Sequence, residues 1–207
     1  MKVKAPNVRR YRGVRPDERR ARRKAELILA GIAVYGERGY RHSTVKAVCD
    51  AAGLTERYFY ESFVNSEALL AACYEAITKR FMEGLLKAGA EGAGKRASRA
   101  ERMRTMLHAY FTTLRREPRS AQVFLTEIRG IGPVVDAALE SSLREFGRHI
   151  RETMAPDAGE RLVILEAGVV GGVMHIALRW IADGYRPSVA KVTAAALLLC
   201  QVFARKS

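Results

Sequence analysis

Apolar residues recur at spacings of three and four along most of this chain, which is the period of an amphipathic α-helix. Gly and Pro residues fall between many of these periodic stretches. The pattern predicts an all-α fold of about nine helices. The predicted helices cover residues 17–38, 44–52, 55–63, 65–88, 98–117, 123–128, 134–154, 160–182 and 188–204.

The stretch Thr44–Phe63 predicts two short helices joined by a tight turn. Thr44 and Thr55 each precede a helix, where a hydroxyl can accept a hydrogen bond from a free backbone N–H group. Gly53 suits the left-handed conformation that closes the first helix. This arrangement is typical of a helix-turn-helix, whose second helix enters the major groove of DNA. An ordinary helical hairpin inside an all-α domain has the same pattern.

Other helices carry signals at their ends. Ala21 and Ala25 fall on the predicted apolar face of the first helix, and Gly39 is its predicted C-cap. Glycines between residues 89 and 94 predict a flexible loop after the fourth helix. Ser98 begins a Ser-x-x-Glu capping box, which starts the fifth helix.

The last two predicted helices, 160–182 and 188–204, are apolar nearly all round. A helix without a polar side has to be covered on every side, and one chain of 207 residues can hardly cover both. We therefore expect a homodimer through residues 160–204, with two helices from each copy in the interface. Glycines between residues 168 and 172 would let the helix backbones approach closely.

The charge of the chain changes this picture. A net charge of +14 indicates a polyanionic partner, either nucleic acid or an anionic membrane surface. Residues 1–24 hold eleven Lys and Arg against two acidic residues, so +9 of the total lies there. We predict a flexible basic arm over residues 1–16, which either binds DNA phosphate or is a solvated tail.

Cysteine usage and hydropathy bear on the compartment. The three cysteines are far apart, and neither they nor the four His residues have metal-ligand spacing. We expect reduced cysteines in a cytoplasmic protein, with no metal. The basic N-terminus has no apolar stretch after it, unlike a signal peptide. The longest apolar stretch, from Glu166 to Arg179, falls short of the roughly 18 uninterrupted apolar residues of a membrane span, so no membrane partner is expected.

Over Tyr35–Leu69 the order and spacing of residues resemble the TetR family of bacterial transcriptional regulators. The matching positions are Tyr35, Gly39, Tyr40, Thr44, Val45, Ala51, Gly53, Leu54, Thr55, Phe59, Tyr60, Phe63, Glu67 and Leu69. Val64 stands where the family often has Pro, and Ser66 where it often has a Lys that touches DNA phosphate. The resemblance implies a helix-turn-helix domain over residues 17–64 and an effector-binding and dimerisation domain over residues 65–207.

Candidate DNA contacts lie in and before the two short helices. Arg57 is the best base reader, because a guanidinium can pair with guanine O6 and N7, although a solvated surface Arg has the same pattern. Thr44 and Thr55 combine a hydroxyl with free N–H groups, which bind phosphate or only cap the helix. Glu56 either accepts from cytosine N4 or stabilises the helix N-terminus. The remaining candidates are Lys46, Tyr58 and Tyr60 in the motif, and Arg15 and Arg19 before it.

The resemblance also implies a small-molecule pocket among the helices of the body. Six apolar or aromatic residues are candidates for its lining, and would otherwise be ordinary core: Met103, Met106, Tyr110, Phe124, Met174 and Trp180. Polar groups on apolar helices need partners if they are buried. The candidates of this kind are Glu127, Glu166, His175 and Arg179, which either pair with one another or bind a polar or anionic effector.

These features favour a DNA-binding regulator, with a homodimer on a palindromic double-stranded operator that a small-molecule effector releases. The resemblance implies repression as the more frequent outcome. An enzyme is not expected, because no catalytic dyad, triad or carboxylate pair stands out, and no cofactor is expected either. The alternative is a basic helical module that binds nucleic acid or anionic membrane non-specifically through residues 1–24.

Overall fold

The computed structural model describes residues 15–92, 94, 96–156 and 163–204. The described residues form nine α-helices and no strand, which confirms the predicted all-α class. The first helices are α1 (Pro16–Arg38), α2 (Val45–Ala52), α3 (Glu56–Ser62) and α4 (Ser66–Lys87). The others are α5 (Arg99–Arg116), α6 (Pro118–Gln122), α7 (Pro133–Met154), α8 (Val163–Ala182) and α9 (Val189–Cys200). Most of the predicted arm and residues 160–162 of the predicted eighth helix lie outside the described residues.

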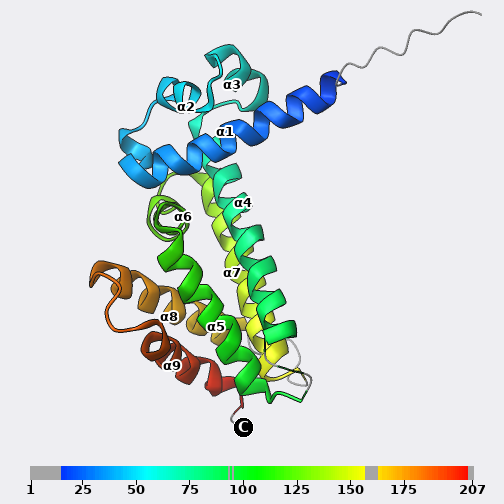
Figure 1. Cartoon of the computed structure of the whole chain (residues 1–207), viewed down its shortest axis with the longest axis vertical. Coiled ribbons are helices and arrows are strands. Elements are labelled where there is room, and N and C mark those ends of the chain that lie inside the picture. Colours follow the sequence, from blue (N-terminus) through cyan, green and yellow to red (C-terminus); the bar gives the residue numbers. More distant parts are fainter. Residues whose placement is uncertain (1–14, 93, 95, 157–162, 205–207) are drawn as a thin grey trace, which may run out of the picture.

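The helices are arranged as a small head and a longer body (Figure 1). Helices α1, α2 and α3 pack together in the head, and α4 runs from the head along the body. In the body, α4 packs against α5 and α7. Helix α8 packs on α7, and α9 packs on α5 and α8. The head therefore reaches the apolar terminal helices through α4 and its neighbours.

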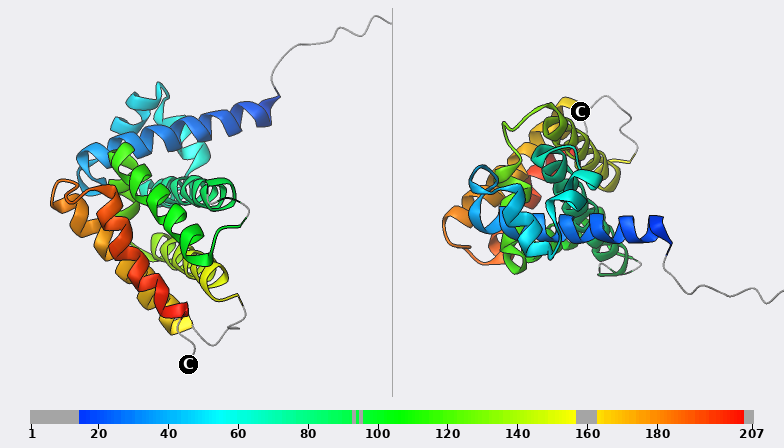
Figure 2. Two further views of the ribbon diagram at one scale, coloured as in Figure 1. Left: turned by 60° about the horizontal axis from the view of Figure 1, so that its bottom comes forward. Right: turned by 90° about the horizontal axis from the view of Figure 1, so that it is seen from above.

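Helix α1 projects beyond the rest of the head at its N-terminal end (Figure 2). The backbone N–H of Arg15 donates to the carboxylate of Glu18 at 3.2 Å and so helps to cap the helix. Full burial begins only at Leu27. The expectation that Ala21 and Ala25 lie on a buried face is therefore wrong. Both are exposed, because this end of the helix extends past the residues on which it would pack.

The helix-turn-helix forms largely as its sequence predicts. Thr44 Oγ1 accepts from the N–H of Ala47 at 3.1 Å, which confirms this cap. Gly53 adopts a left-handed conformation with φ +65°, as the turn requires. Thr55 is the N-cap of α3, as predicted, but its side chain makes no capping hydrogen bond. Phe59 of α3 is fully buried and anchors this helix in the head.

The structure also confirms the predicted C-cap of α1 and the predicted capping box of α5. Gly39 ends α1 with φ +83°, and its N–H donates to the carbonyl of Tyr35 at 3.0 Å. Ser98 accepts from the N–H of Glu101 at 3.2 Å, and the Glu101 carboxylate accepts from the N–H of Ser98 at 2.8 Å. The Ser98 hydroxyl also donates to this carboxylate at 2.7 Å, and this bond, together with that from the Ser98 N–H, lowers the pKa of Glu101 because both favour its charged form.

Helix α4 has 22 residues, which makes it about 33 Å long. The chain continues from it as a π-helical turn over Ala88–Gly92, so the loop predicted for these glycines begins only after that turn. Gly89 allows the turn to pack on α5, because a Cβ there would lie 2.8 Å from the side chain of Met106. The helical path thus runs without a break from the head to the far end of the body.

Head and body also touch through α1 and α6. Gly36 of α1 lies so close to the backbone of Arg119 that a Cβ at this position would overlap the Arg119 carbonyl. The Arg119 guanidinium forms an ion pair with Glu37 at 2.7 Å. A second contact joins Tyr40, in the turn after α1, to Glu127 of the body. The end of α1 is therefore held against the body at two points.

Candidate functional site

The outer side of α2 and α3 carries most of the predicted DNA contacts. These residues lie on the two helices or at their N-termini, in the part of the head that faces away from the body (Figure 1). The exposed ones are Thr44, Lys46, Thr55, Glu56, Arg57 and Tyr60. The structure thus brings them together on one part of the surface, and their contact with DNA stays a prediction.

Glu61 gathers three guanidinium groups at the end of α3. Arg57 Nε lies 3.1 Å from its carboxylate, and Arg23 of α1 lies 3.5 Å from it. Arg20 donates to the backbone carbonyl of Glu61 at 2.8 Å. The Arg57 side chain is 84% exposed, and exposed pairs of this kind are weak. Arg57 can therefore exchange Glu61 for another acceptor at little cost.

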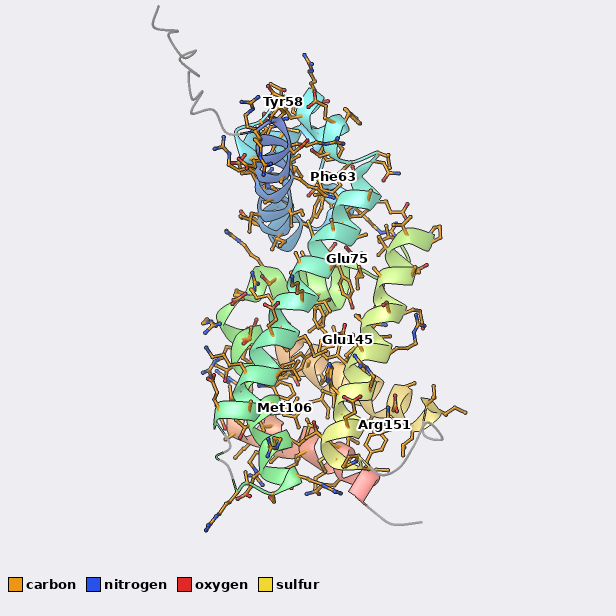
Figure 3. The ribbon with its side chains drawn as sticks, turned by 90° about the vertical axis from the view of Figure 1, so that its right-hand side faces the viewer. Tyr58, Phe63, Glu75, Met106, Glu145 and Arg151 are labelled. Atoms are coloured by element: carbon orange, nitrogen blue, oxygen red, sulfur yellow. The ribbon has the colours of Figure 1, made fainter. Side chains whose placement is uncertain are left out.

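Tyr58 and Tyr60 have different environments. The Arg23 guanidinium lies 4.3 Å from the ring centre of Tyr58, a cation–π contact that fastens α3 to α1. Tyr58 is half-buried, and Figure 3 shows it at the head end of the molecule. Tyr60 is 59% exposed. Tyr60 is therefore the more accessible of the two rings.

The basic candidates outside α3 are Lys46, Arg15 and Arg19. Lys46 Nζ lies 2.8 Å from Asp50, and this hydrogen bond raises the pKa of Lys46 because it stabilises the charged amine. Arg15 and Arg19 are exposed on the projecting end of α1, where Arg15 pairs with Glu18 at 3.0 Å. All three side chains present positive charge at the surface of the head.

A cavity of about 60 Å³ lies in the body. Five of the ten predicted pocket residues line it: Met103, Met106, Tyr110, Phe124 and Met174. The prediction missed eight further lining residues: Met82, Leu85, Leu107, Phe146, His149, Ile150, Val170 and Val173. They come from α4, α5, α7 and α8, so the cavity joins helices that are far apart in the sequence. Figure 3 shows Met106 in this part of the body.

Methionine is unusually frequent around this cavity. Four of the six methionines in the chain line it, namely Met82, Met103, Met106 and Met174. A methionine side chain is unbranched and changes rotamer easily, so such a lining adapts to guests of different shape. In the sequence only Met103 and Met106, three residues apart, indicate this lining, because the clustering of all four methionines arises from the packing of α4, α5 and α8.

Tyr110 gives the cavity one polar group. Its side chain is only 7% exposed, and its hydroxyl finds no hydrogen-bond partner among the described residues. Burial raises the pKa of Tyr110 well above its usual value, so the hydroxyl keeps its proton. An unpaired buried hydroxyl is costly, and a bound molecule with an oxygen or nitrogen would pair with it.

The other five predicted pocket residues do not line this cavity. Glu166 forms a half-buried ion pair with Arg151 of α7, 2.5 Å apart. Glu127 binds the head instead. Trp180 is core, because its indole N–H donates to the carbonyl of Pro187 at 2.6 Å beneath the connection between α8 and α9. The remaining two, His175 and Arg179, are exposed on the outer side of α8, where Arg179 pairs with Asp183 at 3.2 Å.

Residues 27–73 match the family model for bacterial regulatory proteins of the tetR family. This segment runs from the point where α1 becomes buried, through the helix-turn-helix, into the first half of α4. The chain belongs to the TetR family. It is therefore a DNA-binding transcriptional regulator, and the family is not one of enzymes.

Several TetR-like structures share this fold over most of the chain. FadR from Bacillus subtilis, in complex with stearoyl-CoA, is 19% identical with a TM-score of 0.71, over 85% of this chain and 96% of its own. FadR from Bacillus halodurans is 16% identical with a TM-score of 0.72, over 91% and 96%. AibR, in complex with isovaleryl coenzyme A and operator DNA, is 16% identical with a TM-score of 0.64, over 84% and 96%.

Helix α8 differs from the expectation that no stretch of the chain is long and apolar enough to span a membrane. Among the described helices it alone is long and apolar enough to cross a membrane by length and composition, with a mean hydropathy of 1.4. The expectation of no such stretch depended on uninterrupted apolar residues, whereas polar side chains such as Glu166 and His175 interrupt this helix. Helix α8 packs against α7 and α9, as core helices of the same composition do. Only 33% of its most apolar window is buried within one chain, so much of this helix remains uncovered.

Proposed function

We propose that this TetR-family protein is a cytoplasmic homodimeric repressor that a small-molecule effector releases from a palindromic operator. One observation carries this proposal. Helix α4 belongs both to the DNA-binding head and to the wall of the cavity in the body. Its first turns pack with the head, where Leu69 and Leu70 are fully buried, and its last turns give Met82 and Leu85 to the cavity.

A rigid helix that is shared in this way couples the two sites. An effector that enlarges the cavity displaces Met82 and Leu85, and with them the end of α4. Because α4 is continuous, that displacement moves the head relative to the body. The effector thereby favours one of two head positions, and only one of them fits DNA.

For DNA recognition we propose a domain over residues 17–64, preceded by the basic arm of residues 1–16. Arg57 reads a base, because it reaches out from the second helix of the motif and is held only by an exposed pair. Thr44 and Thr55 present helix N-termini to phosphate. The exposed Lys46, Tyr60, Arg15 and Arg19 add phosphate contacts, while Glu56 and the half-buried Tyr58 orient the helix.

The dimer interface that we propose is the uncovered side of α8 and α9, within residues 160–204. Large apolar residues are exposed there: Ile164 is 90% exposed, Leu198 67% and Val202 40%. Small residues lie between them, including Gly168 and Gly171, which leave room for close helix packing. Residues 65–207 then form the effector-binding and dimerisation domain, and the dimer presents two heads to two half-sites about 34 Å apart.

The effector that we propose has an apolar part that occupies the methionine-lined cavity. The cavity wall supports this, since Tyr110 and His149 are its only polar side chains among the described residues. The ligands bound to FadR and AibR, stearoyl-CoA and isovaleryl coenzyme A, also have an apolar acyl group. As the cavity measures about 60 Å³, it has to widen for an acyl or alkyl chain, which its methionines permit.

Selection of bound sequences from random duplex DNA tests this function. We expect an enriched palindrome, with an affinity that falls steeply as salt increases, because phosphate contacts release counterions. A purified protein that binds all duplexes alike would contradict sequence-specific regulation and support the non-specific basic module instead. With the operator in hand, a screen for compounds that raise the melting temperature and release the DNA identifies effectors.

A further inference from the structure

A second hollow lies beside the cavity. It is a groove of about 550 Å³ between α4 and α7, a size typical of small-molecule sites. Figure 3 looks onto this side of the body and shows Glu75 and Glu145 between the two helices. The groove is lined by Tyr74, Glu75, Thr78, Lys79, Met82, Glu83, Leu86, Ala138, Ser141, Ser142 and Glu145.

The groove is acidic in a strongly basic protein. Its lining holds three carboxylates and one ammonium group, whereas the whole chain has a net charge of +14. Lys79 lies 4.0 Å from Glu83, so these two charges offset each other. Glu75 has no ion-pair partner among the described residues, and Glu145 is only 4.0 Å from a histidine, His149. Two carboxylates on opposite walls are thus left without a fixed cation.

The groove and the apolar cavity adjoin each other. Met82 lines both of them and stands between them. His149 lines the cavity, and its Nε2 atom lies 4.0 Å from the carboxylate of Glu145 in the groove. A flexible methionine separates the two spaces, and a change of its rotamer would open a path from one to the other.

Each of the two spaces contains a buried hydroxyl without a partner. Thr78 in the groove and Tyr110 in the cavity are both 7% exposed, and neither hydroxyl makes a hydrogen bond with a described residue. Thr78 lies close enough to the hydroxyl of Tyr74 to lower its pKa, although the two make no hydrogen bond of normal geometry, and Tyr74 pairs instead with Ser142 across the two helices. Buried polar groups are normally paired, so two orphans along one path indicate a site that is completed by a ligand.

We propose that the α4–α7 groove is the head-group subsite for an amphipathic effector with a positive charge, such as an alkylammonium. The charged end lies between Glu75 and Glu145, within reach of Thr78, and the apolar chain passes Met82 into the cavity. This inference rests on the proposed function and names the chemical class of its effector. A cation that bridges Glu75 on α4 and Glu145 on α7 removes their mutual repulsion and draws the two helices together, which moves the helix shared with the head.

The same charges disfavour an acyl-CoA at this entrance. Coenzyme A carries several phosphate charges, and these would meet the three carboxylates of the groove. The basic surface elsewhere on the chain does not offset this, because salt screens charges more than about 8 Å apart. This chain therefore differs in effector class from FadR and AibR, whose structures contain acyl-CoA ligands.

Four probes with the same ten-carbon chain test the proposal on the full-length protein: decylammonium, decanol, decanoate and decanoyl-CoA. Each is titrated, below its micelle concentration, against protein bound to its selected operator, and the melting temperature of the free protein is measured in parallel. We expect decylammonium to release the DNA and to raise the melting temperature at about tenfold lower concentration than decanol. Decanoate and decanoyl-CoA are expected to be weaker still.

A variant with Glu75→Gln, Glu83→Gln and Glu145→Gln should raise the concentration of decylammonium that is required by about tenfold and leave the response to decanol unchanged. Glu140→Gln is the matched control, because Glu140 lies on α7, pairs with Arg144 and does not line the groove. Tighter binding of decanoate or decanoyl-CoA overturns the proposal, as does operator binding that no probe affects. Both of these outcomes leave the DNA-binding function intact, whereas failure to select any operator contradicts that function itself.

Discussion

The carboxylate of Glu127 accepts a hydrogen bond from the backbone N–H of Tyr40 at 2.7 Å, across 87 residues of sequence. Tyr40 lies in the turn between α1 and α2, immediately before the helix-turn-helix. Glu127 is held in place by the side-chain amide of Gln122, which donates to its second oxygen at 2.9 Å. The Glu127 side chain therefore holds the entrance of the DNA-binding motif against the body, independently of α4.

Replacing this side chain should weaken both stability and coupling. Glu127→Ala leaves the Tyr40 N–H without its acceptor, which we expect to cost about 1–3 kcal/mol of unfolding free energy. The variant should also need more effector to release DNA, because one of the contacts between body and head is gone. Denaturant unfolding and DNA release measure the two effects. Glu140→Ala removes only an exposed pair on α7 and should change stability by less than about 0.5 kcal/mol; equal losses in both variants would contradict the role of Glu127.

The unpaired hydroxyl of Tyr110 predicts a stabilising substitution. Tyr110→Phe removes a buried polar group that makes no hydrogen bond and leaves the ring in place. We expect the unfolding free energy to rise by about 1 kcal/mol, or the melting temperature by about 2–4 °C for a chain of this size. Differential scanning calorimetry checks this. Tyr60→Phe is the control, since Tyr60 is exposed and its hydroxyl is already hydrated; a loss of stability in Tyr110→Phe would show that the hydroxyl has a partner.

The structure separates what local sequence determines from what depends on tertiary contacts. Thr44 and Gly53 were predicted correctly because a cap and a left-handed turn depend only on neighbouring residues. For Glu127 and Trp180 the sequence leaves the pocket and internal packing both open, because helix periodicity shows that a residue faces inward but not which partner it meets. The exposure of His175 could not be predicted, because a helix that is apolar nearly all round hides which side is open to solvent.

The residues that line the cavity could likewise be predicted only in part from the sequence. Met103, Met106 and Met174 could be proposed from sequence because each lies on the apolar face of a recognisable helix, the first two only three residues apart. Met82 and His149 could not, since their place in the wall depends on how α4 and α7 cross α5. The acidic groove was missed for the same reason, because its carboxylates come from two helices that pack together only in the folded chain.

The three cysteines should be unreactive in the folded protein. Burial raises the pKa of Cys200 to about 12, and it raises the pKa values of Cys49 and Cys73 as well, so all three stay protonated at neutral pH. We expect no reaction with a thiol reagent at pH 8 until the chain is unfolded, when three thiols react. Rapid modification of one thiol in the native state would contradict this burial.

These raised pKa values also predict a loss of stability at alkaline pH. A thiol with a higher pKa in the folded state holds its proton while the unfolded chain releases it, so unfolding is favoured as pH rises. For Cys200 the loss begins near pH 9 and continues to about pH 12. Cys200→Ala should flatten the decline in this window when denaturant midpoints are measured from pH 7 to pH 11. An unchanged slope would assign the decline to other groups, such as the buried tyrosines.

The proposed dimer predicts that a charge on the uncovered side of α8 and α9 separates the subunits. Leu198→Glu places a carboxylate at a side chain that is 67% exposed in the single chain. We expect a folded monomer in sedimentation experiments, with weaker operator binding, because each subunit then contacts only one half-site. Leu29→Glu is the control, as Leu29 is similarly exposed on α1 of the head. A dimer that survives Leu198→Glu would place the interface elsewhere.

Replacing Arg57 and replacing Arg15 should weaken DNA binding in two different ways. Arg57→Ala should remove about 1–3 kcal/mol of discrimination at one base position of the operator, because a bidentate contact to guanine is lost. Arg15→Ala should weaken binding to all duplexes alike. It should also reduce the slope of log affinity against log salt concentration by about 1, as expected when one phosphate contact is lost. Arg144→Ala, on α7 in the body, is the control and should change neither. Competition assays with single-base operator variants at several salt concentrations separate the two effects. If Arg57→Ala lowers affinity uniformly, the contact is to phosphate, and base readout has to come from other residues of α3.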